Sequence, residues 1–155
     1  MKSRITGLEE LEQNMKKLTK GVKQATTKAI RRGLNGAARS LEKSIKPNVP
    51  MLKKSTDFRQ KGTIKNNVRH KTIVARDGLS GITKIRVMRT KGRRMARIGE
   101  NTKDKSDPFY WWMVEYGTVK MKGRHYMEKG FKSGEAEALR IAKEICENEL
   151  KKALK

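Results

Sequence analysis

Apolar residues in the first part of the chain recur at alternating spacings of three and four, so that one apolar stripe would run along a helix. The stripe consists of Leu8, Leu11, Met15, Leu18, Val22, Ala25 and Ala29. Thr6 is suited to cap this helix, because Glu9 follows three residues later and each side chain can bond an otherwise unpaired amide. The pattern therefore predicts an amphipathic N-terminal helix.

The helical pattern changes register after Ala29. Gly33 and Gly36 lie in the second part, and each lowers helix propensity by about 1 kcal/mol. Pro47 disfavours helical geometry at the residue before it, which ends the pattern. We therefore expect a helical region over residues 1–46, with a kink or a break near Gly33.

The middle of the chain changes from helical to strand-like spacing. Residues 47–67 have no clear period and indicate an exposed loop. Residues 68–75 and 82–88 are rich in β-forming residues and flank a turn that contains an Asp-Gly pair, so they predict an antiparallel hairpin. Because an isolated hairpin is marginal in water, we expect at least one further strand, around residues 116–121, to complete the sheet.

Two further segments complete the pattern. Residues 89–107 form a long basic loop within the predicted sheet region, residues 68–121, and loops of this length are usually functional or disordered. Residues 133–155 have a helical stripe with acidic residues in the first turns and lysines at the end, which complements the helix dipole. Its members are Leu139, Ala142, Cys146, Leu150 and Ala153. We expect one α+β domain over residues 1–155, with the C-terminal helix packed on a small antiparallel sheet.

Most aromatic residues, including both tryptophans, lie in residues 108–118. Large rings dominate core and interface burial, at roughly 150–250 Å² each, so the core should be organised here. Trp111 and Trp112 could instead stack on the bases of a single strand, but their neighbours Met113 and Val114 favour core or subunit packing. Gly117 follows as a position able to take positive φ.

The net charge of +23, from 39 Lys+Arg and 16 Asp+Glu, predicts strong attraction to polyanions such as nucleic acid or an acidic protein surface. A membrane partner is not expected, because no apolar stretch approaches the roughly 20 residues of a spanning helix. The N-terminus also lacks the apolar core of a signal peptide. A single cysteine, Cys146, excludes an internal disulfide; an inert core thiol is the favoured interpretation, and a reactive thiol is the alternative.

Groups suited to catalysis are scarce. His70 and His125 lack the paired spacing of a zinc site, and the glycines do not form a phosphate-binding loop before a lysine. We expect both histidines to be surface or packing residues. We expect no enzymatic activity, cofactor, metal or small-molecule substrate.

The basic loop allows two interpretations. It is either a solvated segment that maintains solubility or a set of phosphate contacts that salt would weaken strongly. The candidate DNA-facing residues are Arg89, Lys91, Arg93, Arg94 and Arg97. No helix-turn-helix, zinc finger or RNA-binding aromatic pair is recognisable in the sequence to read bases.

Glu115 is the one acidic residue in the aromatic segment. It either points to solvent or pairs with a nearby arginine, or it forms a salt bridge between subunits, whose loss would be costly if it were buried. In the second case, Glu115→Gln should weaken assembly more than folding.

The segment from Tyr110 to Thr118, of the form Tyr-x-x-x-Val-Glu-Tyr-Gly-Thr, resembles a signature of the small neck or tail-completion proteins of long-tailed bacteriophages. These are lambdoid-type head–tail joining components, to which the minor tail protein Z group is distantly similar. Three other stretches match in order: residues 5–18 resemble the opening helix, residues 62–68 the turn into the sheet, and residues 127–131 the segment before the closing helix. The chain departs from the family at two places. His125-Tyr126 replaces proline-phenylalanine, and Pro50 is unusually far from Gly62.

The resemblance implies a structural phage or prophage virion protein of the head–tail joining region, present in the host cytoplasm during assembly. Copies would form an oligomeric ring around the DNA passage, since head-to-tail interfaces can close into rings. Its partners would be adjacent head-completion and tail proteins, with non-specific contact to genomic DNA. The candidate interface residues are Tyr110, Trp111, Trp112, Glu115, Tyr116, Gly117 and Thr118.

The alternative is a free-standing, sequence-independent nucleic-acid-binding protein. The charge fits both functions, whereas the four matching stretches fit only the virion protein. Assembly should depend on the aromatic segment, and simple binding should depend on the arginines of the basic loop.

Overall fold

The computed structural model describes residues 8–89, 93–100 and 103–153, and side chains from residue 13 onward within these ranges. The predicted cap at Thr6 and the predicted DNA contact Lys91 lie outside the described residues. The helices are α1 (Leu8–Ile45), the 3₁₀ turn η1 (Lys46–Asn48), α2 (Thr63–Asn67), α3 (Trp111–Tyr116) and α4 (Tyr126–Ala153). The strands are β1 (Val68–Val74), β2 (Gly81–Val87), β3 (Gly117–Thr118) and β4 (Met121–Lys122).

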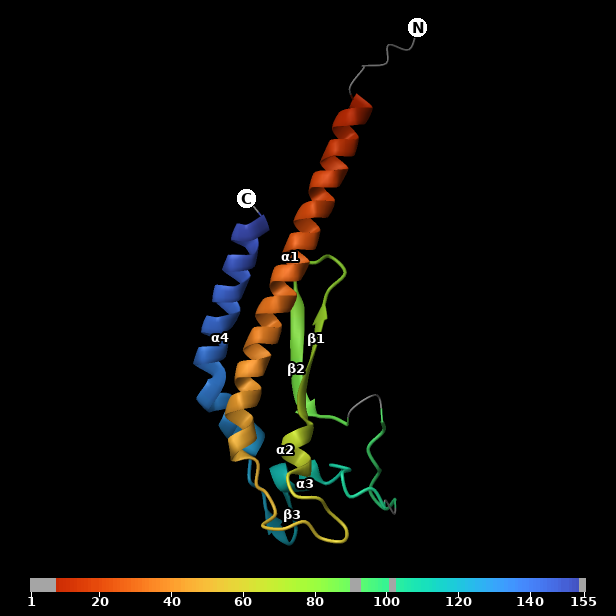
Figure 1. Ribbon diagram of the computed structural model, residues 1–155, viewed down its shortest axis with the longest axis vertical. Helices are drawn as coiled ribbons and strands as arrows, with labels where there is room; N and C mark the ends of the chain where they lie inside the picture. Colours follow the sequence, from red (N-terminus) through yellow and green to blue (C-terminus); the bar gives the residue numbers. More distant parts are fainter. Residues whose placement is uncertain (1–7, 90–92, 101–102, 154–155) are drawn as a thin grey trace.

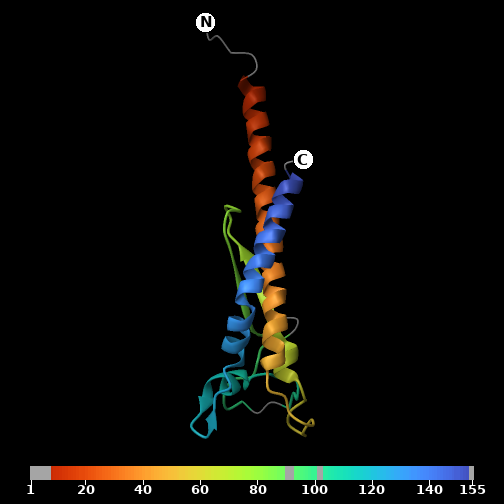
Figure 2. The same cartoon turned by 90° about the vertical axis from the view of Figure 1, so that its left-hand side faces the viewer.

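The long helix α1 is the axis of the molecule (Figures 1 and 2). Helix α4 runs antiparallel along one side of it, and the β1–β2 hairpin lies along the other. The N-terminal part of α1 projects beyond both. At the opposite end lie α2, α3, the β3–β4 hairpin and residues 49–62, which together we call the base. The α+β class predicted from the sequence is confirmed.

Glycines allow α1 and α4 to approach closely. A Cβ at Gly33 would lie 3.0 Å from the carbonyl oxygen of Ala142 and would overlap the sulfur of Cys146. Near the start of α4, a Cβ at Gly130 would lie 2.9 Å from the backbone nitrogen of Ile45. The break considered near Gly33 is absent, because α1 is one continuous helix from Leu8 to Ile45. Its low local propensity is offset by packing against α4.

The β1–β2 hairpin agrees with the prediction, with an antiparallel register that runs from Val68↔Val87 to Val74↔Gly81. The expectation of a third strand in this sheet is wrong within the described residues, since β3 pairs with β4 in a separate two-stranded sheet. The hairpin is instead supported by α1, against which both strands pack. Helix α4 also packs mainly against α1. The expectation that the C-terminal helix packs on the sheet is therefore wrong.

The main core lies where the base meets the end of α1. Its buried members are Ile45, Val49, Ile64, Val68, Val87, Tyr110 and Tyr126. Tyr126 is fully buried, so the position that departs from the family's phenylalanine keeps an aromatic ring in the core. The aromatic segment therefore contributes to the core through Tyr110, with Phe109, Trp111, Met113 and Val114 packed around it.

Two predicted boundaries need correction. Helix α4 begins at Tyr126, seven residues before the predicted start at residue 133. The predicted loop over residues 47–67 contains part of η1 and the short helix α2. Within the described part of the chain, none of the helices combines the length and apolar character needed to span a membrane.

The hairpin is held to α1 by Glu42. Its carboxylate lies 2.7 Å from Nδ1 of His70 in β1 and accepts a bond of 3.1 Å from Nζ of Lys46. Burial would raise the pKa of Glu42, but the hydrogen bonds from His70 and Lys46 outweigh it and hold the pKa below its usual value of 4.5. His70 is therefore a packing residue, in agreement with the expectation from the sequence.

We predict that Gly130→Ala lowers the free energy of unfolding by about 1–3 kcal/mol, because the methyl group would meet the backbone of Ile45. Gly21→Ala is the matched control, since Gly21 lies in α1 and a methyl group there would meet no other atom within 4 Å. It should raise stability by about 0.5–1 kcal/mol. Denaturant unfolding of both variants measures the difference, and equal stabilities would contradict close packing at Gly130.

We also predict that Glu42→Gln lowers stability at neutral pH by about 1–2 kcal/mol, through the loss of charged hydrogen bonds. A carboxylate whose pKa is lowered on folding stabilises above its unfolded pKa, and this contribution is lost as the pH falls through the folded value. The difference between wild type and variant should therefore shrink below about pH 4.5. Glu147→Gln, at an exposed carboxylate on α4, should cost little at any pH. A constant difference for Glu42→Gln across this range would refute the pH dependence.

Candidate functional site

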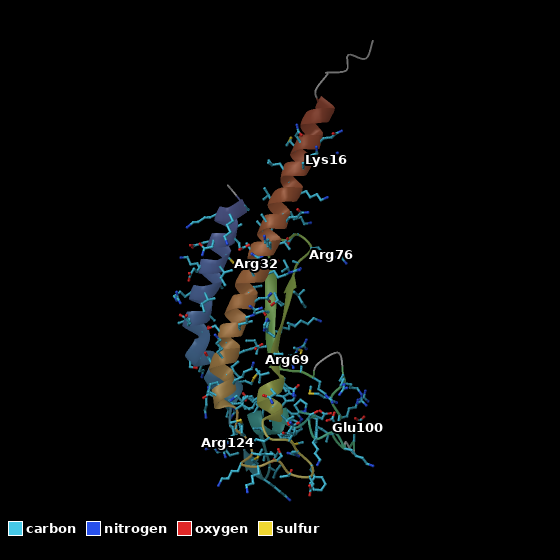
Figure 3. The ribbon with its side chains drawn as sticks, viewed as in Figure 1. Lys16, Arg32, Arg69, Arg76, Glu100 and Arg124 are labelled. Atoms are coloured by element: carbon cyan, nitrogen blue, oxygen red, sulfur yellow. The ribbon has the colours of Figure 1, made fainter. Side chains whose placement is uncertain are left out.

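The aromatic segment forms α3 and then turns sharply at Gly117. This residue has φ +92°, in the region that favours glycine, as the sequence predicted. A Cβ at Gly117 would lie 2.6 Å from the backbone nitrogen of Gly123, so the chain returns closely on itself. The β3–β4 hairpin between these glycines protrudes at the base, and Arg124 follows it (Figure 3).

Glu115 connects α3 to α4. Its carboxylate accepts hydrogen bonds from the backbone N–H of Met127 at 3.0 Å and of Glu128 at 3.4 Å, and only 3% of the residue is exposed. These are amides of the first turn of α4, which lack partners within the helix, and a negative charge there also complements the helix dipole. This capping role was not predicted from the sequence, because the partners lie twelve and thirteen residues away from Glu115.

A hollow of about 440 Å³ opens on one side of α3. The aromatic segment supplies Tyr110, Met113, Val114 and Thr118, and the opposite wall includes Pro50, Met51, Leu52, Thr63 and Ile64. Arg59 and Arg124 contribute positive charge to its lining. The guanidinium of Arg59 lies 4.0 Å from the centre of the Tyr110 ring, at the distance of a cation–π contact.

A second hollow, of about 470 Å³, is lined by Tyr116 and Glu115 of α3 together with residues of α1, β2 and α4. Tyr116 is 67% exposed and Phe131 is 45% exposed, so both rings present apolar surface here. The two hollows place apolar surface at the base that the chain itself does not cover.

The structure divides the seven predicted interface residues. Tyr110 and Glu115 are buried, whereas Trp111, Trp112 and Gly117 are partly buried. Tyr116 and Thr118 are exposed and available to a partner.

Sequence reasoning missed two exposed residues of the β3–β4 hairpin. Val119 is fully exposed and Met121 is 43% exposed. Both residues directly follow the segment that resembles the family signature. The apolar Val119 in the turn between β3 and β4 was the sequence signal that could have identified this surface.

A second exposed apolar surface lies on the projecting part of α1. Met15, Leu18 and Val22 are 62%, 72% and 57% exposed. They belong to the stripe predicted from the sequence, and α4 and the sheet leave it uncovered. Lys16 lies on the same projecting segment (Figure 3).

The basic loop contains its own acidic partners. Arg89 is largely buried and forms ion pairs with Asp104 and Asp107, the second at 3.3 Å. Asp107 is buried and also accepts bonds from the backbone N–H of Ala96 and Phe109. Arg89 therefore holds the loop against the base, which is a structural role within the chain.

The remaining described arginines of the loop lie at its surface. Arg94 pairs with Glu100 at 2.9 Å, and the backbone N–H of Arg97 bonds the same carboxylate. The side chains of Arg93, Arg94 and Arg97 are exposed. Contact of these residues with DNA stays a prediction.

Other candidate chemistry is structural. The thiol of Cys146 lies 3.4 Å from the carbonyl oxygen of Ala29, and burial raises its pKa, which disfavours a reactive thiolate. His125 is exposed and precedes α4 in left-handed geometry, with φ +48°. Among the described residues, no group of three His, Cys, Asp or Glu side chains could hold a metal ion.

Comparison with protein families gives one match. The family described as "Bacteriophage HK97-gp10, putative tail-component" matches residues 9–117, from α1 to the end of the aromatic segment. None of the curated proteins and none of the solved structures compared with the chain matches it.

We predict that Glu115→Ala lowers the free energy of unfolding by about 1–2 kcal/mol, as loss of a helix cap does. Glu115→Gln should cost less, since its amide oxygen can still accept one bond. Glu135→Ala, at an exposed position on α4, is the control and should change stability by less than about 0.5 kcal/mol. Thermal unfolding and solution mass of the same variants separate folding from assembly, and unchanged melting of Glu115→Ala would contradict the capping role.

Proposed function

Because the chain belongs to the HK97-gp10-like family of phage tail components, we propose that it is a structural virion protein of the head–tail joining region. Its copies form an oligomeric ring around the path of the DNA. The protein carries out no catalysis, and its partners are the adjacent head-completion and tail proteins. It acts at the head–tail junction of the virion and is present in the host cytoplasm during assembly.

The observation that carries this proposal is the apolar surface at the base of a very polar chain. Mean hydropathy is −0.84, yet Tyr116, Val119, Met121 and Met51 are between 43% and 107% exposed around the base. Exposed apolar surface of this kind marks contact with another protein. Tyr116 belongs to the segment that resembles the neck-protein signature, Val119 and Met121 follow it, and Met51 lines the same hollow as Tyr110.

The uncovered stripe on α1 supports a ring in particular. It lies at the other end of the long helix from the base, so one copy presents two unlike adhesive surfaces. Contacts between unlike surfaces are head-to-tail, and they close into a ring when the rotation between copies permits. A symmetric dimer would need only one of them.

A free-standing nucleic-acid-binding protein is the second candidate. The net charge of +23 favours it, since such a charge attracts nucleic acid without any assembly. Nucleic-acid binding by a free-standing protein does not explain the apolar surface at the base. The two candidates therefore differ in whether copies associate without DNA.

We predict that the purified protein forms a discrete assembly at high salt without DNA, because apolar contacts are not screened as ion pairs are. Light scattering at low and high salt, with and without duplex DNA, measures this mass. Val119→Asp should shift the protein toward the monomer without loss of stability, since this side chain is fully exposed. Leu139→Asp places the same charge at an exposed apolar site on α4 and should leave the mass unchanged.

A monomer at every salt concentration that binds DNA only at low salt would contradict self-assembly and favour the second candidate. Equal effects of Val119→Asp and Leu139→Asp would contradict the assignment of the interface to the base.

A further inference from the structure

The two faces of the β1–β2 hairpin differ in character. The inner face lies against α1 and includes Val68 and Val87, both almost fully buried, and His70, which bonds Glu42. The outer face comprises Arg69, Lys71, Ile73, Ile82, Lys84 and Arg86. Four of these six residues are cations, and Lys71, Lys84 and Arg86 are exposed.

The register places the cations directly opposite one another. Arg69 pairs with Arg86, and Lys71 pairs with Lys84. Opposite residues on one face have Cβ atoms about 4.5–5.5 Å apart, and like charges in such positions are destabilising. The hairpin segment has one acidic residue, Asp77, which lies in the turn and accepts a bond from the backbone N–H of Leu79. The exposed pair Lys71 and Lys84 therefore opposes strand pairing unless a negative charge lies over it.

We infer that this outer face binds the phosphate backbone of duplex DNA without regard to sequence. The inference rests on the proposed function, because a ring around the DNA path would bring this face close to the duplex. Cations two residues apart on one strand are separated by about 6.6–6.8 Å. This is about twice the 3.4 Å axial spacing of phosphates in one strand of DNA. The cations of β1 and those of β2 can therefore contact phosphates at the same time.

The geometry favours a DNA duplex over an acidic protein surface. Lys71, Lys84 and Arg86 form an exposed, extended array, and none of them lines the hollows at the base or the one along α1. A regular array of flexible cations suits a regular row of phosphates, which position a protein without specifying sequence. The hairpin also differs from the basic loop, where Arg89 and Arg94 already have carboxylate partners. Arg76 marks the turn of the hairpin and Arg69 its other end (Figure 3).

The test is DNA binding by the full chain with three charges removed from the outer face, Lys71→Gln/Lys84→Gln/Arg86→Gln. The control, Lys129→Gln/Lys143→Gln/Lys151→Gln, removes the same charge from exposed positions on α4, on the opposite side of α1. Labelled duplex DNA of mixed sequence is titrated at salt concentrations between about 50 and 200 mM.

We expect the hairpin variant to bind about tenfold more weakly than wild type at about 50 mM salt. Its salt slope should be smaller by about 2.7, because each of the three cations that neutralises a phosphate contributes about 0.9. The control variant should keep most of the affinity and slope. Melting of the hairpin variant without DNA should be unchanged or higher, because the cross-strand repulsion is removed. This result would show that the loss of binding is not a loss of fold.

Equal loss of affinity in both triple variants would overturn the inference, because total charge alone would then explain binding. Unchanged binding by the hairpin variant would overturn it as well. Polyglutamate of matched charge is added as a competitor to the wild-type complex with DNA. If it displaces the DNA at concentrations as low as those of competing duplex, the face would be assigned to an acidic protein instead. The mass of the hairpin variant at high salt without DNA reports on assembly separately, so failure of this inference is distinguishable from failure of the ring.

Discussion

The close contact between α1 and α4 is the constraint on which the rest of the structure depends. Gly33 and Gly130 let the two backbones approach at separate places along the pair, where any side chain would meet the opposite backbone. Because α4 lies so near the end of α1, its first residue, Tyr126, enters the main core. The same approach fixes the first turn of α4 beside α3. The chain has few large apolar residues, so close contact between the backbones of α1 and α4 contributes more to their packing than large side chains do.

The base follows from this contact. Glu115 can cap α4 only because α3 is held beside the start of that helix, and its capping bonds in turn position the hairpin between Gly117 and Gly123. The buried residues Tyr110 and Glu115 of the aromatic segment therefore support the base, while Tyr116 and Thr118 of the same segment are exposed. This division allows one short signature to support the fold and, under the proposed function, to contact a neighbouring subunit. It also means that effects of substitution there need separate measurements of stability and assembly.

The elements whose pattern is local could be predicted from the sequence, and those that depend on distant partners could not. The apolar stripes predicted α1 and α4, and the Asp-Gly pair predicted the β1–β2 hairpin. The start of α4 was placed too late. A break in α1 was considered because glycine has low helix propensity, and periodicity does not reveal a helix packed close by. The extra strand was assigned to the wrong sheet, since the sequence did not indicate that α1 supports the hairpin. In the candidate site, positive φ at Gly117 was predicted, but the cap made by Glu115 was not, because its partners come from another element.

The charge of the chain is easier to interpret once the positions of its carboxylates are known. Net charge of this size destabilises a compact state through self-repulsion, so the few acidic residues matter by where they lie. Glu149 lies 2.7 Å from Arg32 and joins α4 to α1, Glu42 joins the hairpin to α1, and Asp107 holds Arg89 in the basic loop. Each of these carboxylates lies where cations would otherwise disrupt contacts between elements. The outer face of the hairpin has no carboxylate within its own strands, although its cations lie opposite one another across the sheet. The carboxylates that join the elements therefore stabilise the fold from within, and none of these three pairs with Lys71, Lys84 or Arg86 in the ion pairs that they form.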